Sequence, residues 1–238
     1  QGLFEYLGIP YSGSGVLPSA IGIDKSVQKK LMVNAGFNSP SFFSVERKNY
    51  IEGNCKGLFE KAKKEIGFPI VIKPANQGSS IGVTILSEDD NYKFMEAVEK
   101  AFFTKWIDAA EWKKKSTAEK NEFVRVLADI REGIGMPVVI ETETIYHPAD
   151  LITYLDKIFA TNADGVVVEA LDGESKVLIE GFIEGKEFSC IVVQGNTPSP
   201  EERGSRGEVI ALPPTEIRKG KELFDYRSKY LPGLSRKI

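Results

Sequence analysis

The sequence predicts a mixed α+β fold that contains a small antiparallel sheet. Segments with apolar residues three or four positions apart alternate with short β-rich runs, and two of those runs flank a turn rich in glycine and serine. The 238 residues are enough to bury a full hydrophobic core. A composition of 42% apolar and 27% charged residues is typical of a globular protein and excludes a fibre or a disordered chain.

Helices are predicted where apolar side chains recur with helical spacing. This pattern runs from Asp24 to Ala35, recurs before Phe102, and extends from Phe123 to Ile134. Ser116 and Glu119 have the spacing of a capping box, which predicts the start of the last of these helices. Further helices are predicted at 58–66 and 149–159.

Strands are predicted where β-branched and apolar residues form short runs. The runs Phe68 to Ile72 and Ile81 to Leu86 flank the turn at 76–80 and predict a hairpin. Val166 to Leu171 and Lys176 to Ile183 are separated by Asp172-Gly173, a turn signal that predicts a second hairpin. Other strand candidates are 137–144, 188–193 and 209–212.

Several classes of function are excluded by composition. A formal charge of -3 predicts no general attraction to nucleic acid or to an anionic membrane surface. No apolar stretch reaches the ~20 residues that span a bilayer. Cys55 and Cys190 form neither a disulfide framework nor a metal cluster, which favours a reducing cytoplasm. His147, the only histidine, precedes Pro148 and is predicted at a helix start or on the surface, without a metal.

The segment from Lys73 to Ser80 has the residue types of a phosphate site. A lysine at the end of a β-rich run supplies a point charge, Gly78 allows close backbone approach, and Ser79 and Ser80 supply hydroxyl donors. The alternative is an ordinary hairpin that a lysine happens to flank. A Walker A loop, which needs a glycine-rich run that ends in Gly-Lys-Ser or Gly-Lys-Thr, is absent.

A second candidate cluster lies between Glu180 and Glu187. Phe182 and Ile183 could contact an adenine ring, while Glu180 and Glu187 could accept hydrogen bonds from its amino group and from ribose hydroxyls. The alternative is a half-exposed strand, in which acidic and apolar residues also alternate.

The order of these phrases resembles the ATP-grasp D-alanine–D-alanine ligases. Lys25 comes first, then Lys73 with Gly78-Ser79-Ser80, then the Glu180 to Glu187 segment, then Asp225 to Tyr230, and the resemblance covers roughly residues 1–105 and 176–238. It implies an ATP-grasp fold and a ligase that phosphorylates one D-alanine and joins the acylphosphate to a second D-alanine for peptidoglycan precursors.

The resemblance implies roles for individual residues. Lys25 and Lys73 would hold the ATP phosphates with Gly78 and Ser80, and Glu180, Phe182, Ile183 and Glu187 would contact adenine and ribose. The catalytic residues would be Ser79, which orients the first substrate, Tyr230 of a mobile omega loop, and Lys229 over the transferred phosphate. The alternative for that loop is a basic polar tail with two packed tyrosines.

The resemblance also predicts a division into domains. Residues 1–21 would end an N-terminal domain or linker, 22–105 and 176–186 would form the central ATP-grasp subdomain, and 187–238 would begin the C-terminal subdomain with the omega loop. Residues 106–175 match nothing in the family and are predicted to be a mainly helical insert, which could be decoration, an appended subdomain or a partner-binding arm.

The implied ligands are ATP, D-alanine and Mg²⁺. We expect the chain to be a fragment that is inactive alone, with the Mg²⁺ ligands after Ile238 and the glutamate for the first D-alanine before Gln1; no metal site is predicted within it. Two alternatives remain. One is a ligase of the same fold that uses D-lactate or D-serine as its second substrate, although Tyr230 favours D-alanine. The other is a non-catalytic nucleotide-binding or assembly module. No nucleic acid or membrane partner is expected. The sequence leaves the oligomeric state open, with a homodimer of the intact protein as one option because relatives are commonly dimers.

Overall fold

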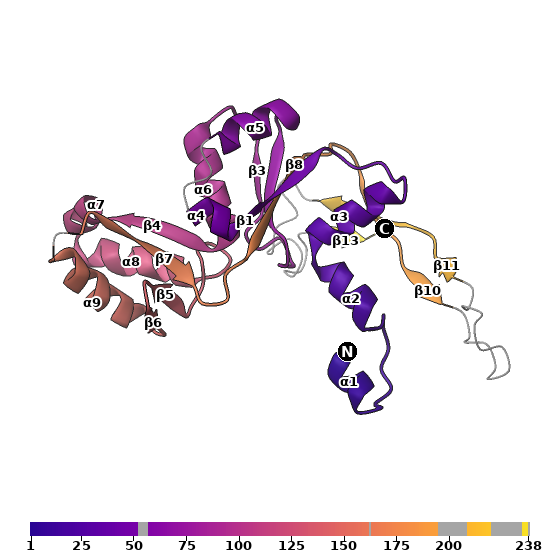
Figure 1. Ribbon diagram of the computed structural model, residues 1–238, viewed down its shortest axis with the longest axis horizontal. Helices are drawn as coiled ribbons and strands as arrows, with labels where there is room; N and C mark the ends of the chain where they lie inside the picture. Colours follow the sequence, from indigo (N-terminus) through magenta and orange to yellow (C-terminus); the bar gives the residue numbers. More distant parts are fainter. Residues whose placement is uncertain (52–56, 162, 195–208, 220–234, 238) are drawn as a thin grey trace. The chain divides into compact units, whose positions relative to one another are not determined.

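The computed structural model describes residues 1–51, 57–161, 163–194, 209–219 and 235–237 (Figure 1). The chain divides into two compact units, residues 1–182 and residues 183–238. Each unit is described separately below.

The first unit contains a central four-stranded antiparallel sheet. Its order is β1 (Phe42–Glu46), β8 (Lys176–Gly181), β2 (Ile70–Pro74) and β3 (Thr84–Leu86). The predicted hairpin is confirmed, because β2 and β3 pair antiparallel with Ile70 opposite Leu86. The mixed α+β class with a small antiparallel sheet is confirmed as well.

The two faces of the central sheet differ. On one face, Ile72 of β2 and Ile179 of β8 pack in a hydrophobic core with helices α5 (Leu58–Glu65) and α6 (Asn91–Phe102). Successive strand residues point to opposite sides, so Lys73 and Glu180 lie on the other face. Helices α5 and α6 thus bury one face, and the other face contains Lys73 and Glu180.

Short helices lie before and after β1 in the sequence. Helices α1 (Gly2–Tyr6), α2 (Val16–Ile23) and α3 (Lys25–Asn34) precede β1, and α4 (Arg47–Ile51) follows it. The predicted helix at 24–35 is confirmed by α3, which begins after Asp24 because the Asp24 carboxylate accepts hydrogen bonds from the backbone N–H groups of Ser26 and Val27.

Residues 104–170 form a second antiparallel sheet with its own helices. The strand order is β4 (Thr104–Asp108), β7 (Gly165–Ala170), β5 (Val138–Ile140) and β6 (Glu143–Ile145). Helices α7 (Ala109–Lys114), α8 (Thr117–Ala128) and α9 (Pro148–Phe159) pack on it around a core that includes Trp112, Leu155 and Phe159. The segment predicted as mainly helical thus contains both helices and strands, and its boundaries as an insert stay a prediction.

Two helices in this segment begin where the sequence predicts. Ser116 and Glu119 form the predicted capping box of α8. His147 is the N-cap of α9, and its Nδ1 accepts from the backbone N–H of Ala149 at 3.2 Å, which confirms the predicted helix-start position. The predicted extension of α8 to Ile134 is wrong: the chain turns after Ala128, and Gly133 comes so close to Leu127 that a Cβ there would lie 2.5 Å from its backbone.

The hairpin predicted at Asp172-Gly173 is also wrong. Strand β7 pairs with β4 and β5, whereas β8 pairs with β1 and β2, so the turn carries the chain from one sheet to the other. A Cβ at Gly173 would lie 2.6 Å from Arg47 Nη1 and 3.1 Å from the Phe102 carbonyl, so glycine permits this crossing. Near the same point the backbone N–H of Ala170 donates to the Phe103 carbonyl at 2.9 Å.

The second unit contains short strands. Strands β9 (Glu187–Ser189), β12 (Thr215–Lys219) and β13 (Ser235–Lys237) form an antiparallel sheet in the order β13, β12, β9, and β10 (Val192–Gln194) pairs with β11 (Val209–Ala211). Across the described parts of both units, the helices are all too short or too polar to cross a membrane.

Candidate functional site

Lys73 and Glu180 form an ion pair on the polar face of the central sheet. Val71 lies opposite Glu180 in the β2–β8 register, so Lys73, two positions further, projects from the same face. The Lys73 ammonium donates to Oε1 of Glu180. The pair is sheltered, because the side chains of Lys73 and Glu180 are only 19% and 9% exposed.

A second lysine reaches the same carboxylate from helix α3. Lys29 Nζ lies 2.8 Å from Oε2 of Glu180, which is within ion-pair distance. This contact lacks hydrogen-bond geometry, and Oε2 is a buried oxygen with no hydrogen-bond partner among the described residues. Lys29 also lies 5.8 Å from the centroid of the Phe42 ring. Two ammonium groups therefore converge on one carboxylate that keeps an unused acceptor.

Lys25 lies one helical turn before Lys29 and holds the loop that follows β2. Its Nζ donates to the carbonyls of Ala75, at 3.3 Å, and of Gln77. Asp24, just before it, caps α3; burial acts to raise the pKa of Asp24, but hydrogen bonds from the Ser26 hydroxyl and from the N–H groups of Val27 and Ser26 lower it below its usual value.

The loop itself turns sharply at the two serines. Ser79 and Ser80 have φ angles of 54° and 61°, a left-handed conformation that non-glycine residues rarely adopt. The Ile81 N–H donates to the Gly78 carbonyl at 3.1 Å, and the Val83 N–H donates to the Ser80 carbonyl at 3.3 Å. Strain of this kind persists where the surrounding structure holds the loop and is common at ligand sites.

Glu174 holds the loop from the other side. Its carboxylate accepts from the backbone N–H of Asn76 at 3.1 Å and from the Asn76 side-chain amide at 3.2 Å. Burial raises the pKa of Glu174, and the two Asn76 hydrogen bonds and the Lys25 charge oppose this effect. Sequence reasoning missed both Glu174 and Lys29; the four-residue spacing from Lys25 to Lys29 was the one available signal, because it places both lysines on one helix face.

The first unit thus brings Lys73 and Glu180 into contact. Lys25 of α3 contacts the backbone just before Gly78, Ser79 and Ser80. Phe182 ends this unit, is 38% exposed, and donates its N–H to the Pro69 carbonyl at 3.0 Å.

The other predicted site residues lie elsewhere. Ile183, 70% exposed, and Glu187, opposite Ile217 in the β9–β12 pair, belong to the second unit. Lys229 and Tyr230 lie outside the described residues. The roles of all predicted site residues stay predictions.

No cluster of three or more histidine, cysteine, aspartate or glutamate side chains in the described parts of the chain could hold a metal ion.

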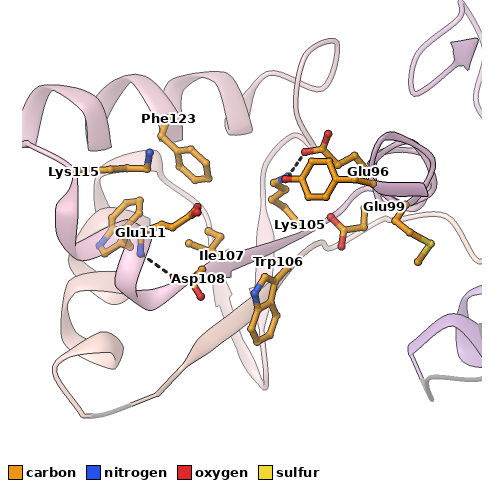
Figure 2. Close-up of a pocket in the computed structure, with 12 residues that line it drawn as sticks. Glu96, Glu99, Lys105, Trp106, Ile107, Asp108, Glu111, Lys115 and Phe123 are labelled. Carbon is orange, nitrogen blue, oxygen red and sulfur yellow. Dashed lines mark hydrogen bonds and ion pairs between the residues drawn. The ribbon is translucent and has the colours of Figure 1, made fainter. Parts of the chain in front are cut away.

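A separate cavity of about 320 Å³ lies where α6 meets the second sheet and its helices (Figure 2). Lys105 points toward Glu96 across it, with Nζ 3.6 Å from the carboxylate, and Trp106 lies at its edge. Burial raises the pKa of Glu99, which also lines the cavity. None of the predicted site residues that the structure describes lines this cavity, so it is distinct from the Lys73–Glu180 site.

Comparison with known proteins agrees with this geometry. The profile of the family described as D-ala D-ala ligase C-terminus matches residues 31–111, which include Lys73 and the serine loop. A D-alanine–D-alanine ligase of Acetivibrio thermocellus is 28% identical over 236 residues, which are 99% of this chain and 41% of that protein. The chain is therefore similar to D-alanine–D-alanine ligases, through the family profile over residues 31–111 and through a 28% identical relative over almost its whole length.

Other D-alanine–D-alanine ligases match a smaller part of the chain at higher identity. The D-alanine–D-alanine ligase of Geobacillus thermodenitrificans is 40% identical over 99 residues, which are 41% of this chain and 27% of that protein. The chain therefore spans less than half the length of these ligases.

A solved structure shares the fold. The VanG D-Ala:D-Ser ligase from Enterococcus faecalis matches 100% of this chain and 43% of its own, with a TM-score of 0.53 and 22% identity. At this identity the likeness concerns the fold alone, and it supports the ATP-grasp architecture.

Proposed function

We propose that this chain is the nucleotide-binding part of an ATP-dependent ligase that joins two D-alanines through an acylphosphate for cytoplasmic peptidoglycan precursor synthesis. The observation that carries the proposal is the convergence of Lys73 and Lys29 on Glu180, on the polar face of the central sheet. The similarity to D-alanine–D-alanine ligases supports the same interpretation.

The residues of this face fit a nucleotide. An adenine amino group needs an acceptor, and Oε2 of Glu180 is a buried oxygen that lacks a hydrogen-bond partner among the described residues. Phosphates need positive charge and hydroxyl or N–H donors, which Lys73, Lys25 and the serine loop supply. An ammonium group has three donors, so Lys73 can keep its bond to Glu180 while it donates to a phosphate.

The chemistry assigned to the chain follows from these groups. A carboxylate is a poor electrophile until a phosphoryl group gives it a leaving group, and that transfer needs concentrated positive charge. In this proposal Lys25 and Lys73 hold the phosphates, the Ser79 hydroxyl orients the first D-alanine, and Lys229 and Tyr230 close over the transferred phosphate and exclude water. Mg²⁺, when bound, would neutralise phosphate charge, and no step is assigned to a metal ligand here.

Nucleotide titration tests the binding role of the chain. We expect Lys73→Ala to weaken ATP binding more than tenfold, because a charge-assisted hydrogen bond to a sheltered group contributes roughly 1.5 to 3 kcal/mol. The matched control is Lys93→Ala, since Lys93 also pairs with a glutamate, Glu88, but is 52% exposed. Equal dissociation constants for the Lys73 variant and the wild type would contradict the phosphate role.

A phosphate-release assay on the complete gene product tests the reaction. We expect release from ATP to depend on D-alanine, and Tyr230→Phe to slow turnover while ATP binding is kept. Release that depends instead on D-serine or D-lactate would identify a ligase with another second substrate. Binding of ATP without any release that depends on these substrates would identify a nucleotide-binding module.

A further inference from the structure

The segment between the two sheets contacts the loop that follows β2 through a buried carboxylate. Glu174 is 4% exposed, lies two residues before β8, and is the bidentate acceptor for the backbone and side-chain N–H groups of Asn76. A buried carboxylate is costly unless it is paired or hydrogen-bonded. Its two bonds to one residue therefore fix that residue strongly.

Lys25 and Glu174 bind the backbone of the same three residues, 75–77, through opposite kinds of hydrogen-bonding group. Lys25 binds the carbonyls of Ala75 and Gln77, and Glu174 binds the N–H of Asn76 between them. The backbone of 75–77 is thus held by a cation on its acceptors and by an anion on its donor. This arrangement fixes the backbone orientation where the chain enters Gly78, Ser79 and Ser80.

The far end of the loop is anchored to the core of the second sheet. Ile81 packs against the hydrophobic cluster that contains Phe103. Gly82 has a φ of +70°, and a Cβ there would lie 2.7 Å from Pro74 Cγ and 3.2 Å from Phe103 Cζ, so the loop end is pressed between these two rings.

Between the two anchors the loop borders empty space. A cavity of about 320 Å³ separates Gln77 from residues of the second sheet region, among them Ile134, Met136 and Asp172. Because packing does not fill the space beside Gln77, the two anchors contribute to the position of the loop.

We propose that Glu174 is a positioning residue for the serine loop, and that residues 104–175 act in nucleotide binding by holding this loop at both ends. The inference rests on the proposed nucleotide site and assigns a role to a segment for which the sequence analysis predicts none. Glu174 itself does not contact the phosphates in this proposal, because a carboxylate at that place would repel them.

The test measures ATP affinity and thermal stability together in the 238-residue chain. We expect Glu174→Ala to raise the dissociation constant for ATP about tenfold, as when one partner of a charge-assisted hydrogen bond is removed. Asn76→Ala should have a smaller effect, since the backbone N–H remains, and the double variant should bind no more weakly than Glu174→Ala alone. Glu174→Gln, which retains one acceptor, should recover part of the affinity and covers the case in which the alanine variant does not fold.

The matched control is Asp156→Ala. Asp156 is also a carboxylate of this segment with two hydrogen bonds, from Trp112 Nε1 at 2.8 Å and from Lys120 at 2.6 Å, but it lies in α9, away from the loop. We expect Asp156→Ala to lower the melting temperature and leave ATP affinity unchanged.

Three outcomes would overturn the inference. Glu174 variants that lose stability but bind ATP like the wild type would show a structural role only, and additive effects in the double variant would show that Asn76 and Glu174 act independently. A wild-type chain that binds no nucleotide would overturn the proposed function, and this inference with it, so the two failures are distinguishable.

Discussion

The two sheets of residues 1–182 place their charged groups differently. In the central sheet, the Lys29, Lys73 and Glu180 side chains are 17%, 19% and 9% exposed, although all three carry charge. In the second sheet region, the carboxylates of the ion pairs are more exposed: Glu169, Asp156 and Glu122, paired with Arg47, Lys120 and Arg125, are 30%, 48% and 60% exposed. The interior there is built from apolar and aromatic side chains.

This difference separates a binding surface from a stabilising core. An exposed ion pair contributes about 0 to 1 kcal/mol and costs little desolvation. A sheltered group of two ammonium ions and one carboxylate carries a desolvation cost and a net charge, so stability alone does not explain it. The comparison supports the proposal that the polar face of the central sheet binds an anionic ligand, whereas the second sheet owes its stability to apolar burial.

The largest expected effect concerns the apolar core of the second sheet. Trp112 is 1% exposed and packs against Phe123 and Phe159, so Trp112→Ala should lower the free energy of unfolding by about 3 to 5 kcal/mol. Urea denaturation measures this loss. The control is Trp106→Ala, because Trp106 is 47% exposed and its removal should cost about 1 kcal/mol or less. Equal losses in the two variants would contradict the conclusion that apolar burial stabilises the second sheet.

A smaller effect is expected on the polar face of the central sheet. Glu180→Gln replaces a charged acceptor with a neutral one, so ATP affinity should fall about fivefold, in line with the greater strength of charge-assisted bonds. The exposed carboxylate Glu122 provides the control, and Glu122→Gln should not alter ATP affinity. Calorimetric titration compares the two variants. If Glu180→Gln lost stability and kept its ATP affinity, the sheltered charges would serve the fold and not a ligand.

The smallest effect concerns the cap of α3, which presents Lys25 and Lys29. Because the folded pKa of Asp24 is lowered, its stabilisation is fully present above the ordinary value of 3.8 and is lost as the pH falls through the lower folded value. Asp24→Ala should therefore cost about 1 kcal/mol near neutral pH and progressively less in acid. Thermal melts between neutral and acidic pH measure this trend. Asp24→Asn can cap the helix without a charge, so the stability of this variant should depend less on pH. A cost of Asp24→Ala that grows in acid would contradict the capping role of the Asp24 carboxylate.

Local signals made much of the fold predictable from the sequence. The N-cap Asp24, the capping box of Ser116 and Glu119, and the alternation in β2 and β3 act within a few residues, so they can be read without tertiary information. The order of Lys73 and Glu180 along the chain suggested a shared site, and the structure brings the two side chains into contact.

What the sequence could not supply depends on long-range pairing. Asp172-Gly173 is a valid local turn signal, but β8 gains more by pairing on both sides in the central sheet than by closing a hairpin with β7. The Glu174–Asn76 contact joins residues 98 positions apart and the contact of Lys29 with Glu180 joins a helix to a strand, so neither leaves a periodic pattern. Contacts of this kind are visible only once the sheets are assembled.

The hydrogen bond from the Ala170 N–H to the Phe103 carbonyl has a consequence for how such a chain can be built. The chain enters and leaves residues 104–170 at neighbouring points, so we expect that removal of this stretch would leave the strands of the central sheet in place. A short linker from Phe103 to Leu171 would reconnect the chain, and the central sheet would keep its strand order β1, β8, β2, β3.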